Sequence, residues 1–299
     1  MRLNFENENT FGLGDKIHSL YERALKKIEK NYLGKKYSLI INGKRVFTDK
    51  QIETFSPIDR ETLIGKFQIA TKENVVDAIE AAHKSFEKWE DMGWEKRCQL
   101  SFKAYKVARK RKFEIAAIVS YENGKNRYEA IGEVDEGLDF LKYYPYLIIQ
   151  NNGLVIDRRA RKYVEAELGF QGAVAKGEEV KIVARPFGVW SVIAPFNFPF
   201  SISIGMSSAA LITGNTVVFK PSFGDNPAPL SGYIIYEIFE EAGFPKGVFN
   251  YITGFGSEIG DELILNEKVR GIAFTGSKDV GFKIYQRIIN SKVPKQLVV

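Results

Sequence analysis

The stretch "GVWSVIAPFNFPFSISIGMSSAALITGNTVVFKPS", residues 188–222, decides the fold of this chain of 299 residues. It has no charged residue before Lys220, and an uncharged run of this length raises the question of a membrane span. Its prolines, glycines and serines would leave backbone groups without partners in lipid, so we reject a span. A strand at 188–195, a helix at 201–212 and a strand at 215–221 satisfy those groups inside a globular domain instead.

The same alternation continues toward the C-terminus. Strand patterns "VFNYIT", "GIAFTG" and "KQLVV" alternate with helical patterns at 229–241, 257–266 and 280–290. Four strand–helix units and a fifth strand predict an α/β fold, a doubly wound, Rossmann-like parallel sheet of five strands with right-handed crossovers. Because ligands of such sheets bind beyond the carboxyl ends of the strands, we expect the chemistry in the loops that follow them.

The N-terminal half is predicted to be mostly helical. Asn42-Gly43 between two β-prone runs predicts an early hairpin. Thr71 is expected to cap a helix with one apolar face. Further helices are predicted at about 95–111, 113–122 and 128–145. Gly124 is expected to end the second of these, and the third is expected to stop near Pro145.

Composition favours a cytoplasmic protein. The hydrophobic fraction of 44% and the charged fraction of 27% are ordinary for soluble domains. Cys98 is the only cysteine, which excludes an internal disulfide and fits a reducing compartment. With His18 and His83 as the only histidines, we predict no metal site. The first residues, "MRLNFENENT", lack the apolar core of a signal peptide.

The charge balance is mildly basic. Lys and Arg number 43 against 37 Asp and Glu, giving a net charge of +6 and a pI of about 9.1. One denser basic run comprises Lys103, Lys106, Arg109, Lys110, Arg111 and Lys112. Such a run is usually a solvated helix face, and an RNA-binding dinucleotide fold stays open as an alternative.

Two strand-end loops carry candidate polar groups. "APFNFP" after the first strand is a stiff turn, so the amide of Asn197 would be held where it can donate to a developing oxyanion. The competing interpretation is a turn asparagine that satisfies local backbone groups. After the second strand, Lys220 is placed to bond ribose hydroxyls or a phosphate, unless it is simply a surface lysine.

The next two loops are rich in glycine. "TGFGSEIG" after the third strand approximates a dinucleotide fingerprint but is one residue too long. In "FTGSKDVG", Gly276 and Ser277 stand where a helix begins, so its backbone N–H groups and dipole can take a pyrophosphate. Each glycine alone has a plain turn explanation, but the convergence of four loops favours a dinucleotide site.

Several segments in consistent order resemble one known family. "ARPFGVWSVIAPFNFP", "VVFKPS", "EEAGFPKGVFN" and "IAFTGSKDVG" are similar to landmarks of the aldehyde dehydrogenase superfamily, over about Tyr37 to Val299. "YENGKNRYEAIGEVDEGLDFLKYY", with F-N-F in place of the commoner W-N-F, resembles its 1-pyrroline-5-carboxylate dehydrogenase branch. The resemblance implies NAD(P)-dependent oxidation of an aldehyde through a cysteine thiohemiacetal. In this branch, the reaction converts glutamate semialdehyde to glutamate in proline breakdown.

The resemblance also assigns roles. It makes Asn197 the catalytic oxyanion donor and places Phe198 in the aldehyde pocket. Its implied cofactor-binding residues are Ile193, Ala194, Pro195, Phe196, Lys220, Gly256, Gly276 and Ser277. Members that use NAD often carry a glutamate where this chain has Phe223, so either NAD or NADP is expected.

The catalytic half of the family is expected to be missing. In the family, the strand matching "KQLVV" continues into Glu-x-Gly-Gly-Lys, which supplies the general base, and the cysteine nucleophile follows. This chain stops at Val299, and Cys98 is expected to be a packing residue within a helix. We therefore expect dinucleotide binding at best, and no dehydrogenase activity from this chain alone.

These inferences divide the chain into three parts. Residues 1–150 are expected to form the mostly helical part of the cofactor-binding domain, 151–185 an extended oligomerisation arm, and 186–299 the α/β core. The arm predicts a homo-oligomer or a mixed assembly. The alternative is a non-catalytic nucleotide-binding or interaction subunit that joins an intact or split enzyme. Neither a membrane nor a nucleic acid is expected as a partner.

Overall fold

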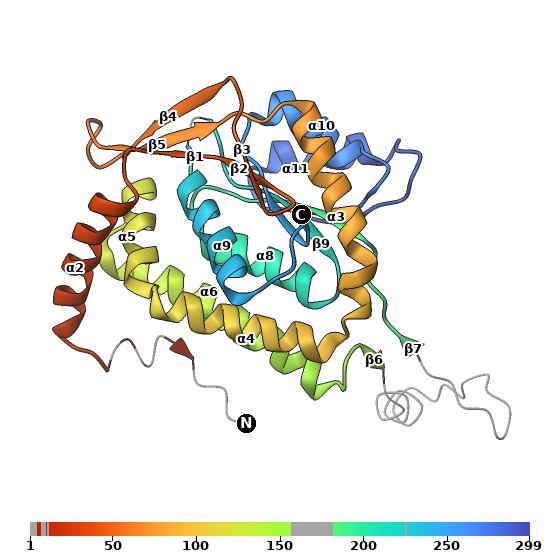
Figure 1. Cartoon of the computed structure of the whole chain (residues 1–299), viewed down its shortest axis with the longest axis horizontal. Coiled ribbons are helices and arrows are strands. Elements are labelled where there is room, and N and C mark those ends of the chain that lie inside the picture. The colour runs from red at the N-terminus through yellow and green to blue at the C-terminus, as the bar shows by residue number, and fades with distance from the viewer. Residues whose placement is uncertain (1–4, 7–9, 11, 157–181, 225) are drawn as a thin grey trace, which may run out of the picture.

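The computed structural model describes residues 5, 6, 10, 12–156, 182–224 and 226–299. A seven-stranded sheet lies at its centre, with helices on both faces (Figure 1). In spatial order the strands are β12 (Gln296–Val298), β11 (Val269–Phe274), β8 (Val189–Ile193), β9 (Thr216–Lys220), β10 (Phe249–Tyr251), β2 (Leu39–Ile41) and β3 (Lys44–Val46).

The strands from β8 to β12 confirm the predicted parallel sheet. Each of the four neighbouring pairs among them is parallel. The chain runs outward from β8 through β9 to β10 and then returns to the other side of β8 as β11. The strand order therefore reverses beside β8, and such a reversal is where doubly wound sheets bind ligands.

The early hairpin is also present, and it extends this sheet. Asn42 and Gly43 have φ angles of 53° and 69°, the left-handed turn that the Asn-Gly pair favours. β2 pairs antiparallel with β3 and also with β10, where Ile40 lies opposite Tyr251. The sequence predicted the hairpin but not its pairing with the parallel strands.

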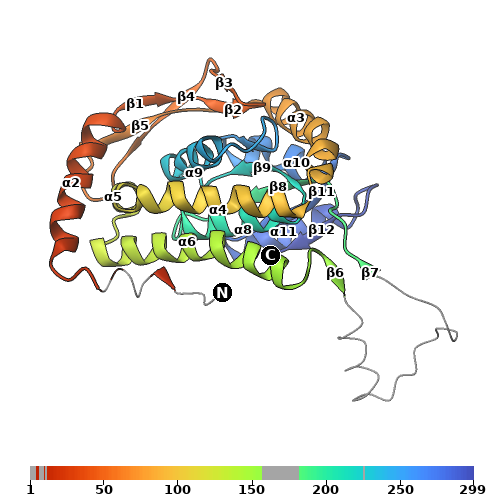
Figure 2. The same ribbon diagram turned by 60° about the horizontal axis from the view of Figure 1, so that its bottom comes forward.

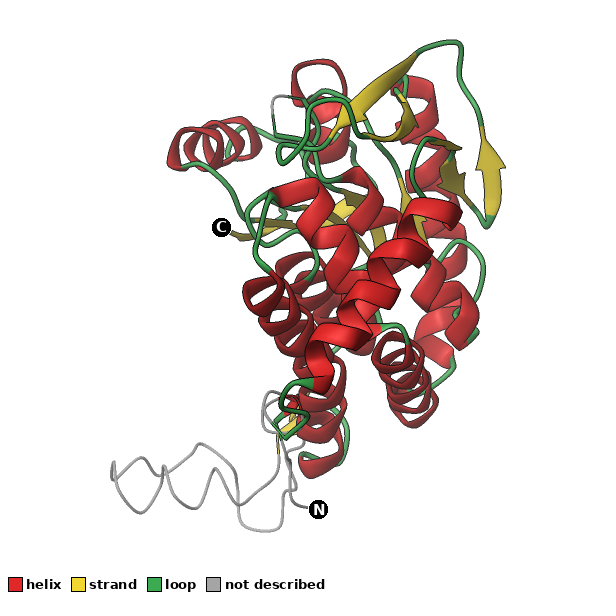
Figure 3. Cartoon of the chain, turned by 90° about the vertical axis from the view of Figure 1, so that its left-hand side faces the viewer, coloured by secondary structure: helices red, strands yellow, loops and turns green. Residues whose placement is uncertain are grey.

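Helices cover the two faces of the sheet in unequal depth (Figures 2 and 3). On one face, α8 (Ser201–Ile212) and α9 (Pro229–Ala242) pack on the strands, and an outer layer packs on them. That layer consists of α4 (Trp94–Lys110), α5 (Lys112–Asn123) and α6 (Arg127–Gln150). The opposite face carries α3 (Lys72–Asp91), α10 (Gly256–Leu265) and α11 (Lys278–Ile288). Each face buries its own apolar cluster.

Some elements were not predicted. α2 (Lys16–Asn31) packs against α5, and a second sheet has the order β1 (Lys35–Tyr37), β5 (Leu63–Gln68), β4 (Gln51–Phe55). Of the predicted arm, β6 (Val155–Ile156) pairs antiparallel with β7 (Ile182–Val183). Residues 157–181 lie outside the described residues, so the arm stays a prediction.

The helix boundaries agree with the sequence at two caps and disagree at one proline. Thr71 and Asn74 form a capping box at α3, and Gly124 ends α5 with a φ of 79°. The predicted stop near Pro145 is wrong, because α6 continues to Gln150. A proline within a helix leaves the carbonyl four residues earlier without its N–H partner. Here the Ser101 hydroxyl donates to the Leu141 carbonyl at 2.9 Å, so the helix tolerates the proline.

One glycine leaves room for a bulky ring on the neighbouring strand. Gly271 on β11 lies opposite Trp190 on β8, and a Cβ atom at Gly271 would collide with the Trp190 ring. We expect Gly271→Ala to lower the free energy of unfolding by about 1–3 kcal/mol, the usual cost of overpacking. Urea denaturation measures this, with Gly132→Ala on α6 as the control because no atom outside the backbone of its own helix lies within 4 Å of its Cβ position. Equal stability of the two variants would contradict the expectation.

Candidate functional site at the carboxyl edge of the sheet

The carboxyl ends of three strands meet at one edge. Ile193, the last residue of β8, lies opposite Lys220 on one side and Phe274 on the other. The register continues past the strands, because the Ala194 N–H donates to the Lys220 carbonyl and the Thr275 N–H donates to that of Ile193, at 3.1 and 3.2 Å. The loops after β8, β9 and β11 therefore start side by side.

The loop after β8 presents the predicted oxyanion donor. Ala194 and Pro195 are buried, whereas Phe196, Asn197 and Phe198 are exposed. The Asn197 Oδ1 accepts a hydrogen bond from the Phe198 N–H at 3.1 Å. Among the described residues, its Nδ2 group has no hydrogen-bond partner. The amide is thus anchored through its acceptor and leaves its donors available to a ligand.

Lys220 is not a surface lysine. Lys220 is 6% exposed, and its Nζ donates to the Pro221 carbonyl at 3.2 Å. Within the described part of the chain it forms no ion pair. Burial lowers the pKa of Lys220 to about 8, because the low-dielectric surroundings disfavour the ammonium. Its burial excludes the surface interpretation, and ligand binding by Lys220 remains a prediction.

The residue in the family's usual carboxylate position is aromatic and packed. Phe223 follows β9 and is half-buried. Its ring meets Phe255, in the loop after β10, edge-on at a centroid distance of 5.3 Å. The third residue after Lys220 is therefore a phenylalanine packed on a second phenylalanine, and not a carboxylate.

The glycine-rich loops leave backbone exposed at the start of two helices. Gly256 begins α10 and is exposed, and no atom lies within 4 Å of a Cβ placed at Gly256 or at Gly260 one turn later. Gly276 has no such room, because a side chain there would meet the Phe274 ring. Ser277 caps α11 by accepting from the Val280 N–H at 3.4 Å. These loops combine an open helix surface with helix-start amides, which suits a flat base and a phosphate.

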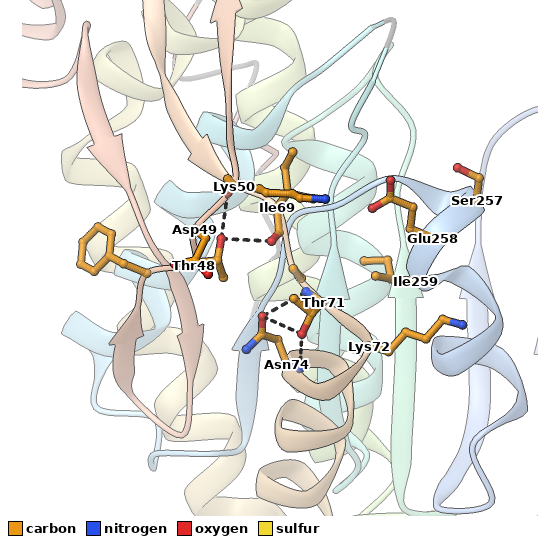
Figure 4. A pocket seen from close by; sticks show the side chains of 12 residues that line it. Thr48, Asp49, Lys50, Ile69, Thr71, Lys72, Asn74, Ser257, Glu258 and Ile259 are labelled. Carbon is orange, nitrogen blue, oxygen red and sulfur yellow. Dashed lines mark hydrogen bonds between the residues drawn. The ribbon is translucent and has the colours of Figure 1, made fainter.

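An open pocket of about 670 Å³ lies at the first turn of α10, directly after Gly256 (Figure 4). It is lined by the N-terminal ends of α3 and α10 and by the segment before β4. Its lining includes Thr48, Lys50, Thr71, Asn74, Ser257 and Glu258. Asn197, Lys220 and Gly276 do not line it. We therefore do not place the dinucleotide in this pocket.

The basic run on α4 and α5 is partly neutralised. Arg109 pairs with Glu6, Arg111 with Glu237, and the buried Lys112 with Asp135. Half of the six cations therefore pair with carboxylates, which weakens the RNA-binding alternative. In the described ranges, no helix is long and apolar enough to cross a bilayer.

Three residues missed by the sequence analysis support the Asn197 loop. The loop is contacted by Asn123 at the end of α5, by Lys125 in the connection to α6 and by Glu133 on the second turn of α6. They lie well over 60 residues before the loop in the chain, so local pattern gave no signal for them. Ile193, Asn197, Lys220 and Gly276 thus lie at or beside the carboxyl edge, and their functional roles remain predictions.

Comparison with known proteins identifies the family. Residues 46–298 match the aldehyde dehydrogenase family. A 1-pyrroline-5-carboxylate dehydrogenase of Geobacillus sp. (strain WCH70) is 39% identical over 89% of this chain and 48% of its own length. The structure of 1-pyrroline-5-carboxylate dehydrogenase from Thermus with bound NAD has a TM-score of 0.80 and 33% identity, covering 95% of this chain and 52% of that one.

A further solved structure carries the other dinucleotide. NADP-dependent glyceraldehyde-3-phosphate dehydrogenase from Bacillus halodurans C-125, complexed with NADP, has a TM-score of 0.75 and 28% identity, covering 88% of this chain and 52% of that one. The chain spans about half the length of the curated relatives it matches. The resemblance to the 1-pyrroline-5-carboxylate dehydrogenase branch is confirmed, and the chain belongs to the aldehyde dehydrogenase family.

Proposed function

We propose that this chain binds NAD or NADP across the carboxyl edge of its sheet, as the cofactor-binding part of an aldehyde-oxidising enzyme. The observation that carries the proposal is the register of Ile193, which sets the Asn197 loop, Lys220 and the Gly276 loop side by side. The donors present suit the ligand: a buried ammonium for ribose hydroxyls, helix-start amides for the diphosphate, and an open surface at Gly256 for the base.

The chain's own residues would bind and orient. Lys220, Gly256, Gly276 and Ser277 would hold the dinucleotide, and the backbone of 193–196 would run along it. The dinucleotide would supply the hydride acceptor. The free Nδ2 of Asn197 would donate to the carbonyl oxygen of an aldehyde, the position where negative charge develops during attack. By similarity to its relatives, the proposed substrate is glutamate semialdehyde.

Phe223, in the loop after β9, bears on whether the site accepts NAD, NADP or both. A carboxylate beside the ribose repels a 2′-phosphate, but Phe223 and Phe255 occupy this region. We propose that both dinucleotides bind. The alternative of a non-catalytic subunit that joins another chain through 151–185 stays a prediction, because most of that segment lies outside the described residues.

The chain alone is expected to bind dinucleotide without oxidising aldehydes. Its one cysteine, Cys98, is buried, and burial raises its pKa to about 11, so the 299 residues supply no reactive thiolate. Titration calorimetry with NAD and NADP tests the binding, and absorbance of the reduced cofactor tests turnover with glutamate semialdehyde. Lys72→Met in the pocket beside α10 is the control and should leave affinity unchanged. Absence of saturable binding by either dinucleotide would refute the proposal.

A further inference from the structure

The two neighbours of Asn197 are held by the last residue of α5 and by a residue in the connection from α5 to α6. The Asn123 Nδ2 donates to the carbonyl oxygen of Phe196 at 2.5 Å. The Lys125 Nζ lies 3.5 Å from the centre of the Phe198 ring, within the range of a cation–π contact. Asn197 therefore sits between a residue fixed through its backbone and a residue fixed through its ring.

Glu133 links this cation to the start of α8. Its side chain is completely buried, and its Oε2 pairs with the Lys125 Nζ at 2.7 Å. Its Oε1 accepts from the Phe200 N–H at 2.7 Å. A carboxylate at a helix start is favoured by the helix dipole, and charged hydrogen bonds are stronger than neutral ones. One carboxylate thus fixes both the cation over Phe198 and the backbone two residues farther on.

Stability alone does not account for this arrangement. Burying a lysine and a glutamate removes both charges from water, and such pairs contribute little net stability compared with apolar packing. What the pair does provide is a fixed geometry for the residues on either side of an exposed asparagine. The Oδ1 of Asn197 accepts a hydrogen bond from its own loop, so the orientation of the loop sets the direction in which its Nδ2 group points.

We propose that Asn123, Lys125 and Glu133 are positioning residues for Asn197. They hold the loop so that the Asn197 Nδ2 group keeps one direction at the edge of the sheet. That this direction serves an aldehyde oxygen rests on the proposed function, whereas the positioning itself does not depend on it. The removal of the cation, the carboxylate or the Asn123 amide should release the Asn197 side chain.

The test observes the Asn197 amide directly. In ¹⁵N-labelled full chain, the side-chain N–H₂ signals of Asn197 are assigned by their loss in Asn197→Ala. In Lys125→Met we expect these signals to move toward the averaged position of a free asparagine, because the ring of Phe198 loses its cation. Lys125→Arg keeps a cation and should restore them. The control Arg127→Met removes a neighbouring cation that pairs with Glu22 and should leave them in place.

A second measurement follows the backbone. Glu133→Ala removes the acceptor of the Phe200 N–H, so its hydrogen exchange should accelerate at least about tenfold. If Lys125→Met fails to fold, Asn123→Ala at the surface end of α5 gives the same answer. Unmoved Asn197 signals in a folded variant would overturn the positioning proposal. Failure of the wild-type chain to bind dinucleotide would refute the proposed function and leave the positioning result intact.

Discussion

Replacement of Lys220 by methionine is expected to weaken dinucleotide binding at least about tenfold while making the fold more stable. Methionine keeps an unbranched apolar side chain in the buried space but removes the ammonium that would bond the ribose. Binding is expected to weaken while stability increases because Lys220 is buried, and in the described part of the chain no carboxylate pairs with it. A cation placed this way opposes folding, which is what we expect of a side chain retained for ligand binding rather than for stability.

The pH dependence fixes the sign of the stability effect. The pKa of Lys220 falls from 10.5 to about 8 in the folded chain, so the protonated side chain opposes folding at pH values below about 8. This opposition fades as pH rises from about 8 to 10.5. The stability gain of Lys220→Met should therefore reach about 3 kcal/mol below pH 8 and decline above it.

Urea denaturation at several pH values and calorimetry with NAD measure the two effects on the same samples. The control is Lys72→Met, which removes an exposed cation outside the edge. A variant that binds dinucleotide as tightly as the wild-type chain would place the ligand away from Lys220. A variant that loses stability would show that the ammonium supports the fold.

The parallel sheet was predictable because its signals are local. Apolar runs such as that ending at Ile193, and turn residues such as Gly276, mark strands and loops without reference to distant parts of the chain. Parallel strands with helical connections then have few possible arrangements. The loops after β8, β9 and β11 consequently start at the edge where sequence alone placed them.

Two of the features that were missed depend on distant contacts. The continuation of α6 past Pro145 depends on a hydroxyl from α4, 40 residues away. The burial of Lys220 depends on how helices and loops close over the end of β9. α2 did carry a local signal, since Ile17, Tyr21 and Ile28 are buried at helical spacing, but it was not predicted.

The buried carboxylate of Glu122 is expected to be the strongest polar support of the fold. Its Oε1 accepts from the Leu230 N–H at 2.6 Å, and its Oε2 accepts from the Ser231 N–H and hydroxyl at 2.7 and 2.6 Å. This carboxylate from α5 therefore satisfies the first turn of α9, which begins with a proline and has no side-chain cap of its own. Glu122→Ala leaves three buried donors without an acceptor, so we expect a loss of about 3–5 kcal/mol in the free energy of unfolding.

Titration of Glu122 gives this support a measurable pH dependence. Burial raises the pKa of Glu122 from 4.5 to about 7, although the hydrogen bonds from Ser231 act in the opposite direction. Because the pKa of Glu122 is higher in the folded chain than in the unfolded chain, protonation of Glu122 stabilises the folded chain. This contribution to the free energy of unfolding is complete below pH 4.5 and is lost as pH rises through about 7. Relative to Glu122→Gln, which cannot ionise, the wild-type chain should lose about 3 kcal/mol between those limits. Denaturation of both chains at pH 5 and at pH 8 measures the difference, with the exposed Glu129→Gln as control. A stability difference that stays constant with pH would show that Glu122 keeps one protonation state throughout.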